Sequence, residues 1–205
     1  MTKRFPVKKF RPWFPCATIL LFAFTVVVDL KLVVESNHST IQFSVPISNG
    51  LTRITGKFND FAIDIDYLAG DITKSKVVAR INVSSVNTGI PGRDEDLKTK
   101  DFFETEKFPE ITFLSDSIRK ANVGYIAFGK FQMHGTTKQI ELPFQITGTD
   151  GEGVIGFTSR YSLKRSDFGV GTDFKHTTDD NFIGNDIGIE IDFWTKKFKE
   201  KKIKN

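Results

Sequence analysis

Cysteine is almost absent from this chain of 205 residues, and its one cysteine, Cys16, lies near the N-terminus. The remainder of the chain cannot form an intramolecular disulfide, so its stability must come from packing and strand pairing. Tyrosine and tryptophan are also scarce, with 3 and 2 residues against 21 phenylalanines. Because phenylalanine has no polar group, this composition suits surfaces that stay fully apolar, either a solid core or the wall of an apolar cavity.

The sequence also lacks the motifs of common catalytic and metal-binding sites. His38, His134 and His176 lie far apart, so a metal site built from them would need carboxylate ligands as well. Asp64 and Asp66 have the form of a glycosidase carboxylate pair, but their i, i+2 spacing places both on the polar face of a strand, toward solvent. Neither a serine or cysteine nucleophile motif nor a phosphate-binding loop is present. We therefore expect no enzymatic activity, no catalytic residue, no metal and no cofactor.

Positive charge is scarce in the middle of the chain and concentrated at its ends, although the net charge is +4. Of the 29 Lys and Arg residues, eleven lie within residues 3–11 and 196–204, which leaves 18. The central part also holds 24 of the 25 acidic residues, so its net charge is about −6. A nucleic-acid-binding surface needs a basic face on the folded domain, and we expect no nucleic-acid partner. Residues 196–205 are interpreted as a solvated basic tail, with attachment to anionic lipid as the alternative.

The N-terminus has the form of a secretory signal. A basic region precedes an apolar run of 13 residues, Cys16–Val28, which is shorter than the roughly 17 to 25 residues of a membrane span. No A-x-A cleavage site precedes Asp29, so a cleaved signal peptide and an uncleaved N-terminal membrane anchor both stay open. We assign residues 1–30 to this segment and residues 31–195 to one folded domain. Export to the periplasm or the medium is expected, and an uncleaved N-terminal segment would associate the protein with the membrane.

From Val33 onward, apolar side chains alternate with polar ones. The alternation is clear in residues 61–67, 76–83, 139–147 and 186–194, and it is typical of half-buried β-strands. Turn residues separate eight or nine such strands, and no helical pattern is long enough for a βαβ crossover. The fold class is therefore all-β, an antiparallel barrel or sandwich. A closed eight-stranded barrel has an interior that side chains just fill or that holds one small ligand.

Two long connections interrupt the strand pattern. The first, Asn87–Ser115, contains Phe102 and Phe103, whereas disordered segments are poor in aromatic residues. It therefore either closes over something or forms a packed corner. A short helix is expected at Arg93–Lys98, where acidic residues occupy the first turn. The second connection is the irregular stretch Lys164–Asn185.

Five separated motifs occur in one order along the chain. They are His38-Ser39-x-Ile41-x-Phe43, Arg53-x-x-Gly56-x-Phe58, Arg93-Asp94-x-x-Leu97 followed by Asp101-Phe102-Phe103, Phe108-Pro109-x-Ile111-x-Phe113, and Gly129-x-Phe131-x-Met133-His134-Gly135-Thr136-Thr137-Lys138. In order and spacing they resemble the YceI-like family, over about residues 33–193. The resemblance implies an extended, eight-stranded, antiparallel lipocalin-like β-barrel, with short helices in the long connections. It also implies an elongated apolar interior that binds a polyisoprenoid lipid, such as a quinone or a polyprenyl lipid, in an exported protein that is often a homodimer. It brings no catalytic residues.

The resemblance favours a cavity over a solid core, which makes the inward-facing phenylalanines candidates for a lipid-binding wall: Phe43, Phe58, Phe61, Phe103, Phe113, Phe131, Phe144 and Phe157. Arg53, Arg93 and Asp94 are candidates for the mouth and cap of the cavity, where a guanidinium could meet a phosphate head group. The alternative for Arg93 and Asp94 is a structural pair that holds the first connection in place.

The function expected from these features is non-catalytic binding of a polyisoprenoid lipid, for its carriage or sequestration in the cell envelope. The alternative is a structural or interaction module, in which a solid barrel presents its long loops to a partner protein.

Overall fold

The structure is a computed structural model that describes residues 29–68, 70–150, 154–177 and 182–197. The strands of these residues are β1 (Asp29–Val34), β2 (Thr40–Ile47), β3 (Thr52–Phe58), β4 (Phe61–Leu68), β5 (Lys76–Asn82), β6 (Val86–Asn87), β7 (Glu110–Lys120), β8 (Tyr125–Met133), β9 (Thr136–Thr149), β10 (Ile155–Lys164) and β11 (Asp186–Lys197). The helices are α1 (Pro91–Lys98) and the 3₁₀ turns η1 (Ser36–His38), η2 (Ile72–Lys74), η3 (Val83–Ser85) and η4 (Arg165–Phe168). None of these helices has the length and apolar character needed to cross a bilayer.

Both predicted end segments lie largely outside the described residues. The apolar run Cys16–Val28 falls entirely among residues 1–28, and most of the predicted basic tail falls among residues 198–205. The described barrel extends slightly beyond the predicted domain at both ends. β1 begins at Asp29, which pairs with Leu68 of β4, and β11 continues to Lys197.

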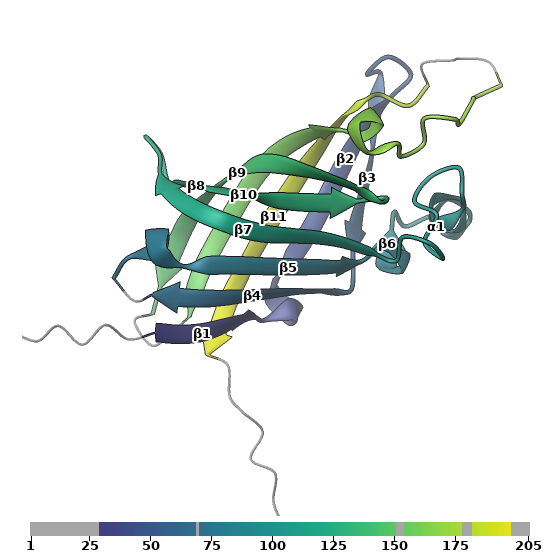
Figure 1. Cartoon of the computed structure of the whole chain (residues 1–205). Helices are drawn as coiled ribbons and strands as arrows, with labels where there is room; N and C mark the ends of the chain where they lie inside the picture. The colour runs from purple at the N-terminus through teal and green to yellow at the C-terminus, as the bar shows by residue number, and fades with distance from the viewer. Residues whose placement is uncertain (1–28, 69, 151–153, 178–181, 198–205) are drawn as a thin grey trace, which may run out of the picture.

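The strands close into an eight-stranded antiparallel barrel, as predicted (Figure 1). Three of its eight strand positions are each filled by two consecutive segments, because β1 continues into β2, β3 into β4 and β5 into β6. β11 shows this directly, since it pairs with β2 through residues 188–192 and with β1 through residues 195–197. The pairing of β1 with β11 closes the ring.

The alternation predicted from the sequence separates the two faces of the wall. Leu32 of β1 and Ile65 of β4 pair with each other, and both are almost completely buried. Asp64 and Asp66 lie on the opposite face of β4 and point outward, where Asp64 forms an exposed ion pair of 3.5 Å with Arg80. The carboxylate pair is therefore a feature of the outer surface of the barrel.

β7 continues beyond the predicted strand at residues 111–115. The prediction stopped there because a β-bulge interrupts the alternation of buried and exposed residues. The register with β8 shifts between Ser115 and Ser117, and the buried positions shift from odd residues to Ile118. Such a bulge lets the strand bend with the barrel. Gly129 of β8 pairs with Ser115, and a Cβ placed on this glycine would lie 2.3 Å from the carbonyl oxygen of Leu114. The close approach of the two backbones at the bulge thus requires glycine.

We predict that Gly129→Ala lowers the free energy of unfolding by about 1 to 3 kcal/mol, the usual cost of overpacking a site that cannot yield. Gly148→Ala is the matched control, because its added Cβ would meet no atom within 4 Å. Urea unfolding of both variants measures the difference. Equal stability of the two variants would show that the bulge adjusts without cost.

Candidate functional site

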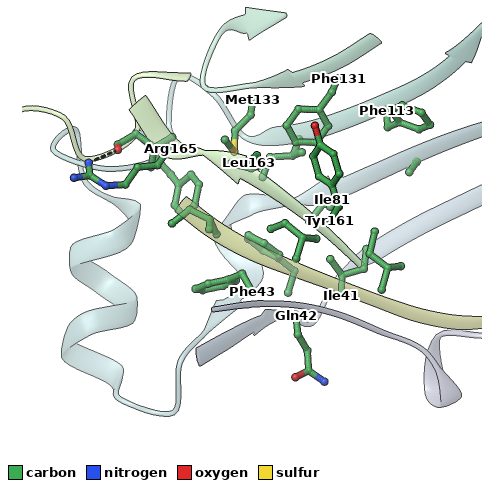
Figure 2. Close-up of a pocket in the computed structure, with 18 of the residues that line it drawn as sticks. Ile41, Gln42, Phe43, Ile81, Phe113, Phe131, Met133, Tyr161, Leu163 and Arg165 are labelled. Carbon is green, nitrogen blue, oxygen red and sulfur yellow. Dashed lines mark hydrogen bonds between the residues drawn. The ribbon is translucent and has the colours of Figure 1, made fainter. Parts of the chain in front are cut away.

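The barrel encloses an apolar cavity of about 950 Å³ (Figure 2). Ligand-binding cavities in proteins are mostly apolar and have volumes of about 300 to 1,000 Å³. The barrel is thus hollow. The alternative function, an interaction module, assumed a solid barrel core, and these strands do not form one.

Seven of the eight phenylalanines predicted for the wall line this cavity: Phe43, Phe58, Phe103, Phe113, Phe131, Phe144 and Phe157. Some of these rings pack on one another. The ring centroids of Phe43 and Phe58 are 5.6 Å apart, and those of Phe144 and Phe157 are 6.1 Å apart. Both spacings are in the range that aromatic pairs prefer. That these side chains contact a lipid stays a prediction.

Phe61 is the exception, since it is not part of the cavity wall. It is the first residue of β4, directly after the bend that joins β3 to β4, and it is half-buried against the core. Ile63 and Ile65, farther along the same face of β4, take the wall positions instead. The alternation placed Phe61 on the inward face of β4, but at the first position of the strand its side chain packs against the core and not along the cavity.

Aliphatic side chains are the largest group in the wall, and a prediction limited to phenylalanine missed them. The aliphatic lining residues are Ile41, Val45, Ile54, Ile63, Ile65, Ile72, Val77, Ala79, Ile81, Ile90, Leu97, Ile111, Ile118, Ala127, Ile140, Leu142, Leu163, Val170, Ile183, Ile187, Ile189 and Ile191. Many of these positions follow from the same period of two that identified the phenylalanines. The signal was therefore present in the sequence.

Tyr161 of β10 adds a hydroxyl group to the wall (Figure 2), where Thr158 and Ser159 of the same strand also line the cavity. Burial, and after it the negative charges of Asp167 and Glu141, raises the pKa of Tyr161. Its hydroxyl therefore stays protonated at neutral pH and can donate a hydrogen bond to a ligand oxygen. A lone tyrosine gave no signal in the sequence that set it apart from a core residue.

α1 and the connection after β10 lie at one end of the barrel (Figure 1). Residues of both connections line the cavity, and we take this end as its mouth. The first connection contributes Arg93, Asp96, Lys100 and Asp101, and the second contributes Phe174, Phe182 and Ile183. The four charged side chains of the first connection are two basic and two acidic, so together they create no strong field of one sign. Arg93 was the one predicted mouth residue that lines the cavity.

α1 confirms the short helix expected at Arg93–Lys98, and Pro91 at its first position suits a helix start. Asp94 holds the helix to the strand before it, because its Oδ1 accepts hydrogen bonds from the backbone N–H of Thr88 at 2.8 Å and from the Thr88 hydroxyl at 2.6 Å. The Thr88 hydroxyl is also the main reason that the pKa of Asp94 is lowered. Asp94 thus fixes the cap, as the structural alternative proposed, with Thr88 rather than Arg93 as its hydrogen-bond partner.

Arg53 does not lie at the mouth, contrary to the prediction. Its guanidinium group crosses from β3 to β2, where it donates hydrogen bonds to the hydroxyl of Ser44 at 2.9 Å and to the carbonyl oxygen of Ser44 at 3.2 Å. Arg53 is on the outward face of β3, so it braces two neighbouring strands from outside.

Arg165, at the start of the second connection, also lines the cavity and was not predicted (Figure 2). Its guanidinium donates to four backbone carbonyls, those of Val170, Gly171, Ile183 and Gly184, at 2.7 to 3.0 Å. Burial lowers the pKa of Arg165. One side chain therefore ties both ends of the second connection together, and sequence patterns cannot reveal this because its partners are carbonyls of any residue type.

The two connections also contact each other and the barrel rim. The rings of Phe102 and Phe174 lie 5.2 Å apart, and Phe108 packs edge-on against His134, in the turn between β8 and β9, at 4.7 Å. His134 Nδ1 lies 3.0 Å from the carbonyl oxygen of Phe168, and it must carry the hydrogen because a carbonyl can only accept. These contacts join the connections into one cap over the cavity.

The chemistry of the site is that of an apolar container with a polar rim. Its charged side chains lie at the mouth, and its interior is almost entirely hydrocarbon. Among the residues that the structure describes, no three His, Cys, Asp or Glu side chains are grouped as metal ligands would be. The arrangement is suited to holding an apolar molecule, with Tyr161 and the mouth residues as its polar contacts.

Comparisons with known proteins agree with this description. The family model described as a YceI-like domain matches residues 32–194. A UPF0312 protein of Yersinia enterocolitica is 32% identical over 152 residues, which is 72% of this chain and 79% of the relative. BcnA of Burkholderia cenocepacia has a similar fold, with a TM-score of 0.71 at 20% identity over 80% of this chain and 99% of its own. A polyisoprenoid-binding domain from Saccharophagus degradans has a TM-score of 0.65 at 17% identity, covering 82% and 99% of the two chains.

We predict that the backbone amide of Thr88 titrates with Asp94, at a midpoint below the ordinary aspartate pKa of about 3.9. A lowered pKa in the folded state means that Asp94 stabilises the cap above that ordinary value, and that this stabilisation is lost as the pH falls through the folded pKa. NMR titration of the Thr88 amide measures the midpoint. Asp94→Asn should abolish this titration, whereas Glu106→Gln, at an exposed carboxylate of the same connection, should leave it unchanged. A midpoint at or above 3.9 in the unsubstituted protein would contradict the role given to Asp94.

Arg165→Met should lower the free energy of unfolding by about 2 kcal/mol or more, because it leaves four carbonyls without their charged donor while keeping the aliphatic stem. Arg80→Met is the control. Arg80 forms an exposed ion pair of 3.5 Å with Asp64, and such pairs contribute at most about 1 kcal/mol. Chemical denaturation compares the two variants. A smaller loss for Arg165→Met than for Arg80→Met would rule out the bracing role of Arg165.

Proposed function

The chain belongs to the YceI-like family, and on that premise we propose that it binds a polyisoprenoid lipid, of the quinone or polyprenyl type, inside its barrel and leaves the lipid chemically unchanged. The observation that carries the proposal is the apolar cavity of about 950 Å³. The similar fold of a domain named for polyisoprenoid binding supports it.

The apolar wall accounts for binding without directional contacts. Each buried methylene equivalent contributes roughly 0.8 kcal/mol, so about ten of them contribute roughly 8 kcal/mol before the cost of association. Such a wall does not distinguish one isoprene unit from the next. Selectivity then arises from the length of the chain that the cavity accommodates.

The polar end of the lipid lies at the mouth in this proposal. Arg93 and Lys100 are the cations there, and a guanidinium can bind a phosphate through two parallel hydrogen bonds. Asp96 and Asp101 balance this charge, which suits an uncharged head group such as a quinone or an alcohol equally well. The bound lipid is the ligand, and the function requires no further cofactor.

We assign this function to the cell envelope, where the protein would carry or sequester the lipid after export. Support comes from the form of residues 1–28, a basic region followed by an apolar run of 13 residues. A cleaved N-terminus would release a carrier, and an uncleaved one would keep the barrel at the membrane surface that holds its ligand.

Filling the cavity tests the proposal. Phe131→Trp and Phe144→Trp each enlarge a side chain of the wall, and each should reduce the uptake of a radiolabelled polyprenol from vesicles at least tenfold. Because the added atoms enter existing space, the free energy of unfolding should change by less than the roughly 1 to 3 kcal/mol of overpacking. Phe128→Trp is the control, since Phe128 lies outside the cavity, beside Arg119. Unchanged polyprenol uptake by both wall variants would refute binding in the cavity.

A further inference from the structure

The barrel wall is not continuous between β9 and β10. The two strands pair only from Thr149 with Ile155 to Gln145 with Thr158. Beyond these pairs, residues 136–144 of β9 pair with β8, and residues 159–164 of β10 pair with β11, but no ladder pair joins these two described stretches to each other. We name the line between them the β9–β10 seam.

Pro143 explains why the ladder stops at this point. The hydroxyl of Ser159 donates to the carbonyl oxygen of Pro143 at 2.6 Å, so this carbonyl faces β10. The N–H and C=O groups of one strand residue point to the same side, and the nitrogen of Pro143 therefore also faces β10, where it has no hydrogen to donate. Proline in a sheet is confined to such edges. The pairing of β9 with β8 is unaffected, because it uses the neighbouring residues.

Side chains alone close the seam. Ile140, Tyr161 and Leu163 line both the cavity and a second hollow on the outer side of the seam. Exposed Gln139 and Lys164 belong to the rim of that outer hollow. The wall is therefore one side chain thick here, whereas along β7–β8 and β10–β11 a continuous backbone ladder separates the cavity from solvent.

The end of the seam away from Pro143 is held by η4. Phe168 is buried there, and its ring lies edge-on to the ring of Phe131 at 5.3 Å. Lys138 of β9 bridges the seam to Asp167 of η4 with an ion pair of 3.2 Å. The side chains of Lys138 and Asp167 are both substantially exposed to solvent, and exposed ion pairs contribute little to stability.

We propose that the β9–β10 seam is a lateral portal, through which the apolar chain of a lipid passes sideways between a membrane surface and the cavity. The inference rests on the proposed function and adds the route. Opening the wall along a paired stretch such as β7–β8 breaks ladder hydrogen bonds, but opening the seam breaks none. It requires that Ile140, Tyr161 and Leu163 change rotamer and that the Lys138–Asp167 pair separate. The hydrogen bond from Ser159 to Pro143 is the one side-chain hydrogen bond described above that crosses the seam. A long chain that used the mouth alone would have to be threaded end-on, past four charged side chains.

A chemical staple across the seam tests this route. In a Cys16→Ser background of the full chain, Gln139→Cys and Lys164→Cys are joined with a flexible bismaleimide. The control staple joins Leu114→Cys to Lys130→Cys, two exposed, paired positions on the continuous β7–β8 ladder. The measurement is the uptake of a fluorescent polyprenol from phosphatidylcholine vesicles, followed both as an initial rate and as the amount bound at equilibrium.

The seam staple should slow uptake at least tenfold and leave the amount bound at equilibrium unchanged, while the control staple alters neither. An initial rate that the seam staple does not change would overturn the portal and leave the mouth as the route. If even the unstapled protein binds no polyprenol at equilibrium, the proposed function itself fails, and the portal fails with it. The two failures are therefore distinguishable in one experiment.

Pro143→Val provides a second test without cross-linking, because it restores the missing N–H toward β10. We expect slower hydrogen exchange at the amide of Glu141, which also faces the seam, together with slower polyprenol uptake. Gln145→Val is the control, since Gln145 already pairs with Thr158. A variant in which the Glu141 amide becomes protected but uptake keeps its rate would overturn the portal. Unchanged exchange at Glu141 would overturn the role of Pro143 in opening the seam.

Discussion

Each strand of this chain has one apolar face, and the ring formed when β1 pairs with β11 buries all of these faces on the inside. The rest of the structure depends on that closure. Strands that run on through a bend, as β1 does into β2, make a barrel longer than its inward side chains can fill. The space between the strands is mainly apolar, because the strand residues that line it were placed there by the same alternation.

Much of this could be predicted from the sequence. The period of two placed Phe43, Phe113 and Phe157 on inward faces, because it depends only on local strand geometry. It also placed Phe61 on the inward face, but this side chain packs against the core outside the cavity wall. In β7 the predicted strand ended too early, because a bulge there moves the buried positions from odd to even residue numbers. The volume of the cavity could not be predicted, because it depends on the diameter of the closed barrel.

The cap shows a different limit. A helix at Arg93–Lys98 could be predicted from local signals, but Arg165 could not, because its partners are backbone carbonyls distant in the sequence. The ladder between β9 and β10 likewise ends at Pro143, and the proline shows its effect only once its neighbour is known. At both the cap and the seam the cavity is closed by side chains rather than by strand pairing, and we place the movement of a ligand at these two regions.

The central claim is that this hollow barrel holds an isoprenoid lipid in the cell. Native mass spectrometry of the full chain, purified from cells with their membranes present and without delipidation, tests the claim most directly. The account predicts a lipid adduct that organic extraction releases and that tandem mass spectrometry identifies by losses of isoprene units. Protein that carries no lipid from such a preparation would contradict it, as would a bound molecule without an isoprenoid chain.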